Sequence, residues 1–208
     1  MSKRAIFLDR DGTLLEEIPH LHHVQDVQVY PKAFEALRKI NRSGSLAVVI
    51  TNQSVVARGL LTEEGLQDIH RTITDRFREN GAWIDSFYYC PHHPQAGSGP
   101  YSRTCRCRKP EPGLLLRAAQ DLKIELAASH IIGDRLHDME AGHRAGCESV
   151  LVKTGNGKEE LLLLNEKSSP TADSHNPLQR PDYVAENILD GVKWILEHGF
   201  EGQPKSAR

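Results

Sequence analysis

Short apolar runs alternate along this chain with longer segments in which apolar residues recur at helical spacing. Continuous apolar runs are typical of buried parallel strands, and they predict strands at 5–8, 46–50, 84–89, 131–132 and 149–152. The helical spacing predicts a short helix that ends near 146, and longer helices at 31–44, 62–80, 113–122 and 182–198. This alternation favours right-handed β-α-β crossovers. We therefore predict an α/β fold with three layers around a doubly wound parallel sheet.

Several segments carry neither pattern, and we predict loops there. Residues 15–29 mix histidines with acidic residues and should form a flap over the strand ends. Residues 90–107 are rich in Pro and Gly. Residues 166–180 are rich in Ser, Pro and Asn and should form a flexible surface loop, while 155–158 predict a turn. The whole chain, 1–208, is expected to form a single domain.

The composition limits the classes of protein to which the chain can belong. Of its 208 residues, 38% are apolar and 26% are charged, which suits a globular domain with a sizeable core. Lys and Arg total 26 against 28 Asp and Glu, so no basic excess suggests a nucleic-acid partner. No apolar run approaches the roughly 20 residues of a membrane span, and Asp9 interrupts the first run too early for a secretory signal. We expect a cytoplasmic monomer that acts on a small molecule.

Polar side chains follow the predicted strands at the points where these strands end. The groups concerned are Asp9, Asp11, Thr51, Asn52 and Asp134. Open α/β sheets bind ligands at the carboxyl ends of their strands, so we expect these groups to share one crevice. Carboxylates hold a hard cation such as Mg²⁺, and Lys109 can neutralise phosphate oxygens. One aspartate can attack phosphorus while another moves a proton, which favours phosphoryl transfer. Each group alone could be a turn, cap or surface charge, and their joint placement argues against that interpretation.

Four short motifs together resemble those of haloacid-dehalogenase-type phosphatases. They are DRDGT at 9–13, TNQS at 51–54, RKP at 108–110, and GD at 133–134 with a further D at 138 after three intervening residues. In order and spacing they are most similar to the branch that contains heptose-bisphosphate and histidinol phosphatases. The resemblance covers roughly residues 4–158 and implies a Rossmann-like fold without a large cap domain.

The resemblance also implies a role for each motif residue. Asp9 would be the nucleophile and Asp11 the general acid and base. Thr51 and Lys109 would steady the transferring phosphoryl group, and Asp138 would orient its neighbours. The ligands of Mg²⁺ would be the Asp9 carboxylate, the Asp11 main-chain carbonyl and Asp134. The substrate-binding residues would be Thr51, Asn52, Gln53, Ser54, Arg108, Lys109 and Arg135.

A second set of chemically distinctive residues lies in the loop at 90–107. Its members are Cys90, His92, Cys105 and Cys107. Three thiolates and one imidazole form a tetrahedral zinc set, and a loop with few apolar residues needs such a crosslink. Because the set leaves no open position, Zn²⁺ would be structural rather than catalytic. The pattern is similar to the zinc loop of the heptose-bisphosphate branch, and the alternative is four unrelated residues with free thiols.

Two cationic residues extend the predicted site beyond the reaction centre. Arg108 directly follows the 90–107 loop, and its guanidinium could bind a second phosphate or carboxylate, while Arg135 stands where the resembled heptose enzymes usually carry lysine. Two cations beyond the reaction centre suit a substrate with a second anionic group. Together with the resemblance, they favour Mg²⁺-dependent removal of the 7-phosphate of a heptose 1,7-bisphosphate through an aspartyl-phosphate. The alternatives are the same chemistry on histidinol phosphate and a non-catalytic phosphosugar-binding protein.

Overall fold

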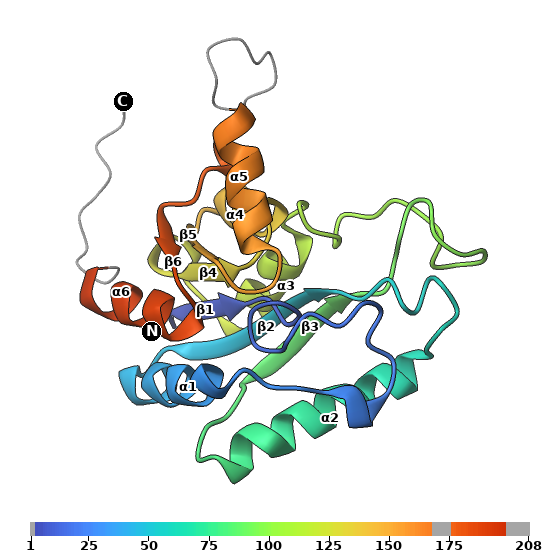
Figure 1. Cartoon of the computed structure of the whole chain (residues 1–208), viewed down its shortest axis with the longest axis horizontal. Coiled ribbons are helices and arrows are strands. Elements are labelled where there is room, and N and C mark those ends of the chain that lie inside the picture. Colours follow the sequence, from blue (N-terminus) through green and yellow to red (C-terminus); the bar gives the residue numbers. More distant parts are fainter. Residues whose placement is uncertain (1–2, 168–175, 199–208) are drawn as a thin grey trace.

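A six-stranded parallel sheet organises the chain, for which the computed structural model describes residues 3–167 and 176–198 (Figure 1). Its strands are β1 (Ala5–Leu8), β2 (Leu46–Asn52), β3 (Ser86–Cys90), β4 (His130–Gly133), β5 (Glu148–Val152) and β6 (Tyr183–Ala185). They lie in the order β3-β2-β1-β4-β5-β6, and every pair is parallel. The chain runs outward from β1 to β2 and β3, and then crosses back to β4 on the other side of β1. Such a switch point opens a crevice at the carboxyl ends of β1 and β4.

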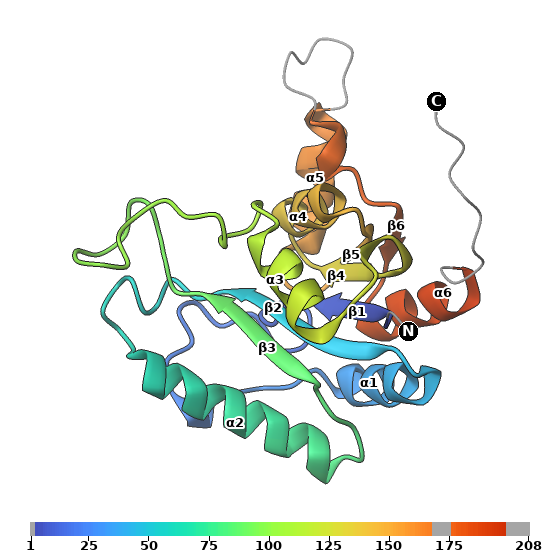
Figure 2. The same cartoon turned by 180° about the vertical axis from the view of Figure 1, so that it is seen from behind.

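Helices cover both faces of this sheet (Figures 1 and 2). They are α1 (Pro31–Ser43), α2 (Glu63–Glu79), α3 (Gly113–Leu122), α4 (Leu136–Ala145), α5 (Gly157–Lys167) and α6 (Ile188–His198). One core contains apolar residues of α1, α2 and α6, and a second contains residues of α3 and α4. This arrangement confirms the predicted three-layer α/β fold. None of the helices in the described ranges is both long and apolar enough to cross a membrane.

Strand β1 shows why the first apolar run becomes the centre of the sheet. Ile6 and Leu8 join the core with α1, α2 and α6, whereas Ala5 and Phe7 join the core with α3 and α4. All four side chains are fully buried. A strand covered on both faces must be apolar throughout, and each large side chain contributes about 1.5–3 kcal/mol through its burial.

The ends of the predicted helices carry the expected local signals. Thr62 caps α2, since its side-chain oxygen accepts a hydrogen bond from the Gly65 N–H at 3.1 Å. Pro31 opens α1, and Gly44 ends it with a φ of 78°. Helices 31–44, 62–80 and 113–122 are therefore confirmed to within one residue at each end.

Two predictions near the end of the sequence are wrong. The proposed helix at 182–198 begins only at Ile188, because Tyr183–Ala185 form β6 and pair in parallel with β5. The turn predicted at 155–158 is shorter, since α5 already starts at Gly157. Of the predicted loop at 166–180, residues 168–175 lie outside the described part, and a short 3-10 helix forms at Pro177–Gln179.

Candidate active site

Asp9 lies at the switch point of the sheet, immediately after β1. Its backbone N–H donates to the Ile132 carbonyl of β4 at 2.9 Å, which extends the strand pairing by one residue and fixes its position. The chain then turns at Gly12, whose φ is 78°. A Cβ atom at Gly12 would lie 2.2 Å from Oδ2 of Asp134, so only glycine fits between these two parts of the site.

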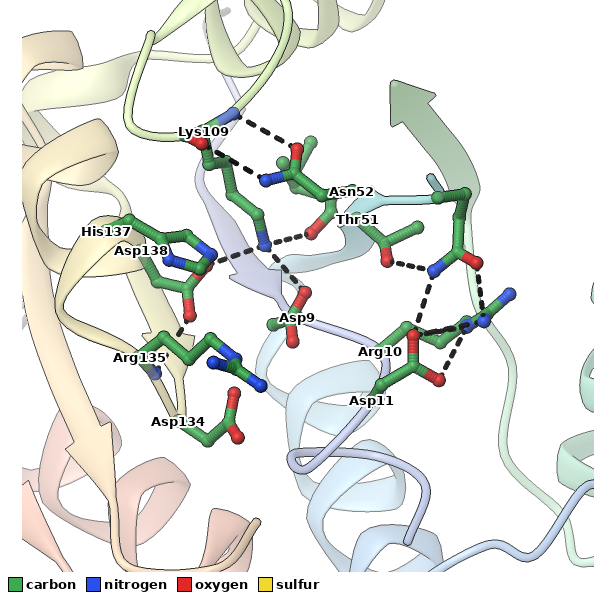
Figure 3. Close-up of polar contacts among 12 residues, drawn as sticks. Asp9, Arg10, Asp11, Thr51, Asn52, Lys109, Asp134, Arg135, His137 and Asp138 are labelled. Atoms are coloured by element: carbon green, nitrogen blue, oxygen red, sulfur yellow. Dashed lines mark hydrogen bonds and ion pairs between the residues drawn. The ribbon is translucent and has the colours of Figure 1, made fainter. Parts of the chain in front are cut away.

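Lys109 lies at the centre of the polar groups at this edge of the sheet (Figure 3). Its Nζ atom donates to Asp9 Oδ1 at 2.6 Å and to the Ile50 carbonyl at 2.8 Å, and it lies 2.6 Å from Asp138 Oδ1. The residue is only 3% exposed. Burial alone would lower the pKa of Lys109, but the carboxylates of Asp138 and Asp9 raise it, so the ammonium stays charged.

Three aspartates form an acidic cluster around this lysine: Asp9, Asp134 and Asp138. One carboxylate oxygen of each lies within 4.8 Å of the others. Burial, together with the other two carboxylates, raises the pKa of Asp134 to about 8. Burial raises the pKa of Asp9 to about 6, although Lys109 opposes this shift. Burial and crowding thus disfavour the charged forms of Asp9 and Asp134, and a divalent cation between them would stabilise both carboxylates.

Asp134 has the side chain best prepared for a cation. Its Oδ2 accepts hydrogen bonds from the backbone and side-chain nitrogens of Asn156 at 2.8 and 3.0 Å. Its Oδ1 is buried and has no hydrogen-bond partner within the described residues. Asp138, by contrast, binds Lys109 and accepts a bond from the Arg135 N–H at 3.1 Å. The donor set therefore fits Mg²⁺ at Asp9 and Asp134, with Asp138 as a support.

Asp11 turns away from the acidic cluster (Figure 3). Its Oδ2 accepts from Gln53 Nε2 at 2.8 Å and lies 3.0 Å from Arg10 Nη2. The same Gln53 nitrogen donates to Thr51 Oγ1 at 2.8 Å. No role was predicted for Arg10, although its position between two aspartates is a signal of ion pairing.

The end of β2 and the residue after it support the lysine as well as facing the cleft. The Asn52 side chain donates to the Lys109 carbonyl and accepts from the Lys109 N–H, both at 3.1 Å. Its amide thus joins the end of β2 to the segment that carries the lysine. Gln53 is 3% exposed, and its amide is bound to side chains of the site. For both residues the structure indicates positioning contacts beside the predicted contact with substrate.

A cleft of about 280 Å³ opens above these groups. All of the residues predicted to act on or bind substrate line it: Asp9, Asp11, Thr51, Asn52, Gln53, Ser54, Arg108, Lys109 and Arg135. The flap contributes Glu17, whose Oε1 lies 3.5 Å from Arg135 Nη2. Arg58 and His93 also line the cleft, although no motif pointed to them. The rim therefore carries several cations, which suits an anionic ligand.

Four potential metal ligands meet in the 90–107 loop, with ligand atoms all within 4.8 Å of one another: Cys90, His92, Cys105 and Cys107. Cys107 Sγ lies 3.3 Å from Cys90 Sγ, 3.2 Å from Cys105 Sγ and 3.4 Å from His92 Nδ1. In a tetrahedral site with Zn–S bonds of about 2.3 Å the sulfur atoms lie about 3.8 Å apart, so small shifts would accommodate zinc. The hydrogen bond between the Cys90 and Cys107 thiols lowers the pKa of Cys107 to about 5 and raises the pKa of Cys90, so Cys107 is the thiolate of the pair.

Comparison with known proteins assigns the chain to a family. The HAD-hydrolase-like family matches residues 106–191. The D-glycero-β-D-manno-heptose-1,7-bisphosphate 7-phosphatase of Pasteurella multocida is 42% identical over 194 residues, which cover 93% of this chain and 97% of that protein. The chain belongs to the HAD-like hydrolases. The phosphatase of the same name from Vibrio cholerae is 42% identical over 156 residues, or 74% of this chain and 84% of that protein.

A solved structure of this HAD-like family has the same architecture. The crystal structure of D,D-heptose 1,7-bisphosphate phosphatase from B. bronchiseptica, complexed with magnesium and phosphate, matches with a TM-score of 0.76 at 29% identity. The match covers 93% of this chain and 98% of that one. The family and the fold predicted from the four motifs are therefore confirmed. The named relatives are phosphatases, which confirms the predicted enzyme class.

Proposed function

We propose that this chain is a Mg²⁺-dependent phosphatase that removes the 7-phosphate of D-glycero-D-manno-heptose 1,7-bisphosphate. The observation that carries the proposal is the buried contact of 2.6 Å between Lys109 and Asp9, beside Asp134 Oδ1, a buried oxygen that has no hydrogen-bond partner in the part of the chain that the structure describes. A nucleophilic carboxylate, a fixed cation and a metal-binding carboxylate are what phosphoryl transfer to an aspartate requires. The names of the relatives support the choice of substrate.

In the first step, a carboxylate oxygen of Asp9 attacks the phosphorus of the 7-phosphate. The bond between phosphorus and the sugar oxygen breaks, and Asp11 gives a proton to that oxygen. Lys109 and the Thr51 hydroxyl stabilise the charge on the phosphoryl oxygens as it passes to Asp9. Mg²⁺, held by Asp9, the Asp11 carbonyl and Asp134, would supply further neutralisation of that charge.

In the second step, water attacks the phosphorus of the aspartyl-phosphate on Asp9. Asp11 takes a proton from this water, phosphate leaves, and the Asp9 carboxylate is restored. The use of one residue as acid and then as base requires a carboxyl group that faces the cleft. Asp11 meets this requirement, since its side chain is 21% exposed and lines the cleft.

We further propose that Cys90, His92, Cys105 and Cys107 hold a structural zinc ion that fixes Arg108. Arg108 Nη1 donates to the His92 carbonyl at 3.1 Å, so a rigid loop at 90–107 would set the direction of its guanidinium. Arg108 and Arg135 would bind the distal phosphate of the substrate. A cytoplasmic monomer remains our expectation, and thiol ligands agree with a reducing compartment.

Values of kcat/KM for phosphate release test the substrate. With Mg²⁺ present, heptose 1,7-bisphosphate should exceed histidinol phosphate by at least about tenfold, since only the former offers a second phosphate to the cationic rim. The Asp9→Asn variant should keep its circular dichroism spectrum and lose turnover. A preference for histidinol phosphate would reverse the order of substrates. Undiminished turnover by Asp9→Asn would exclude Asp9 as the nucleophile.

A further inference from the structure

Arg10 is a large charged side chain that the proposed chemistry leaves without a role. It is 1% exposed, and it lies between the two aspartates to which we assign the reaction. We propose that Arg10 is a positioning residue, which orients the Asp11 carboxylate for proton transfer to and from the leaving oxygen. This inference rests on the proposed function, because it concerns the efficiency of a step in which Asp11 is the acid and base.

The guanidinium contacts Asp11 along one side (Figure 3). Arg10 Nε donates to Asp11 Oδ1 and Oδ2 at 3.1 and 3.2 Å, and Arg10 Nη2 lies 3.0 Å from Oδ2. Several contacts between one planar fork and one carboxylate fix the orientation of the carboxylate as well as its position. Rotation of the Asp11 side chain toward the acidic cluster would break these contacts.

Gln53 extends the same network to the residues around the phosphoryl group. Its Oε1 accepts from Arg10 Nη2 at 2.7 Å, so Arg10 determines which end of the amide carries the donor nitrogen. That nitrogen then donates to Asp11 Oδ2 and Thr51 Oγ1, both at 2.8 Å. Arg10 therefore acts on Asp11 directly and through the Gln53 amide.

The other end of the guanidinium meets a neutral group. His70 of α2 lies with Nε2 3.4 Å from Arg10 Nη1. Burial, and next the charge of Arg10, lower the pKa of His70 to about 3, so the ring is neutral and accepts the hydrogen bond. Within the described residues, Asp11 is the carboxylate that forms an ion pair with Arg10. A buried guanidinium is stable only beside an anion, so the ion pair with Arg10 fixes the position of the Asp11 carboxylate.

Dependence on the leaving group distinguishes a positioning role from a structural one. The alkoxide of an alkyl phosphate needs a proton as it leaves, whereas p-nitrophenyl phosphate releases p-nitrophenolate, an anion stable enough to leave without one. We therefore compare kcat/KM, which reports phosphoryl transfer to Asp9, for the heptose bisphosphate and for p-nitrophenyl phosphate. Arg10→Lys should lower the value for the heptose bisphosphate about 100-fold, the scale of general acid catalysis, and that for the aryl ester less than about threefold.

Two further variants keep this test decisive. Gln53→Met preserves the size of the side chain but removes the amide. It should lower the ratio of kcat/KM for the heptose bisphosphate to kcat/KM for p-nitrophenyl phosphate about tenfold, and it remains a test even if Arg10→Lys does not fold. Asp182→Asn, which alters a half-buried contact outside the cleft, is the control and should leave the ratio of the two kcat/KM values unchanged.

Equal losses on both substrates in the folded Arg10→Lys and Gln53→Met variants would overturn the positioning role, as would no loss on either. This outcome differs from failure of the proposed function. If the proposed function is wrong, the unsubstituted chain will release no phosphate from either ester, and the role of Arg10 is then excluded as well.

Discussion

Replacement of Lys109 by methionine tests the electrostatics of the site. The substitution keeps the length of the side chain but leaves Asp9 and Asp138 without the ammonium that lies 2.6 Å from each. Removal of one partner from a buried ion pair costs about 3–5 kcal/mol, so the free energy of unfolding should fall by that amount at pH 8. Urea denaturation of the metal-free chain, followed by circular dichroism, measures this loss.

The loss should be smaller at pH 6 than at pH 8. Lys109 lowers the pKa of Asp9, which burial nevertheless raises to about 6, so removal of the lysine raises it further. The folded variant then binds a proton near pH 6 that the unfolded chain, with its ordinary carboxyl groups, does not bind. This uptake stabilises the folded variant as the pH falls, and it should recover about 1 kcal/mol or more.

A surface lysine supplies the control for this experiment. Lys39 lies 3.9 Å from Glu35 on α1, and its side chain is 37% exposed. Exposed pairs of this kind contribute about 0–1 kcal/mol. At either pH, Lys39→Met should therefore change the free energy of unfolding by less than Lys109→Met does. A loss below about 1 kcal/mol for Lys109→Met at pH 8, or equal losses at both pH values, would refute the assigned role of the lysine.

Three further predictions concern the surroundings of the site. Cys105→Ser should reduce the zinc content from about one ion per chain to a small fraction of that in metal analysis, and full retention would exclude this ligand. Tyr101→Phe removes a 2.5 Å hydrogen bond from the 90–107 loop to Glu63 of α2, so KM should rise about threefold or more with little change in kcat. A fall in kcat with an unchanged KM would contradict a role of Tyr101 in holding the loop. Burial raises the pKa of Asp182, but hydrogen bonds from His143 and the backbone lower it to about 2, so its contribution is present above pH 3.8 and lost toward pH 2. Asp182→Asn should therefore cost about 1 kcal/mol at pH 7 by urea denaturation, after allowance for solvent screening, and a cost that persisted near pH 2 would contradict this origin.

Much of the site could be predicted because its residues follow strands that the sequence marks clearly. Residues 5–8 are apolar throughout, so they had to lie in a covered strand, and Asp9 had to lie at its end. The cluster of potential metal ligands at 90–107 could be predicted from residue type, since three cysteines and a histidine in a polar loop have few other uses. The roles assigned to these residues remain predictions that the experiments above test.

The parts that could not be predicted depend on contacts between distant segments. Strand β6 has three residues, and Val184 continues the helical spacing of Ile188, so the local pattern favoured one long helix. Helix α5 begins in a segment that contains two glycines, and its exposed Leu162 and Leu163 lie outside any apolar face. From the sequence alone, Arg10 has the pattern of a surface charge. In the structure it is enclosed by Gln53 and His70, which lie 43 and 60 residues further along the chain.

The central claim is that Asp9, held by Lys109 at the end of β1, becomes covalently phosphorylated during turnover. Acid quenching within milliseconds of mixing with substrate, followed by peptide mass spectrometry, tests this directly. A phosphoryl group should appear on Asp9 and disappear as the substrate is consumed. A chain that releases phosphate while Asp9 stays unmodified at every time point, or that carries the label on another residue, would contradict it.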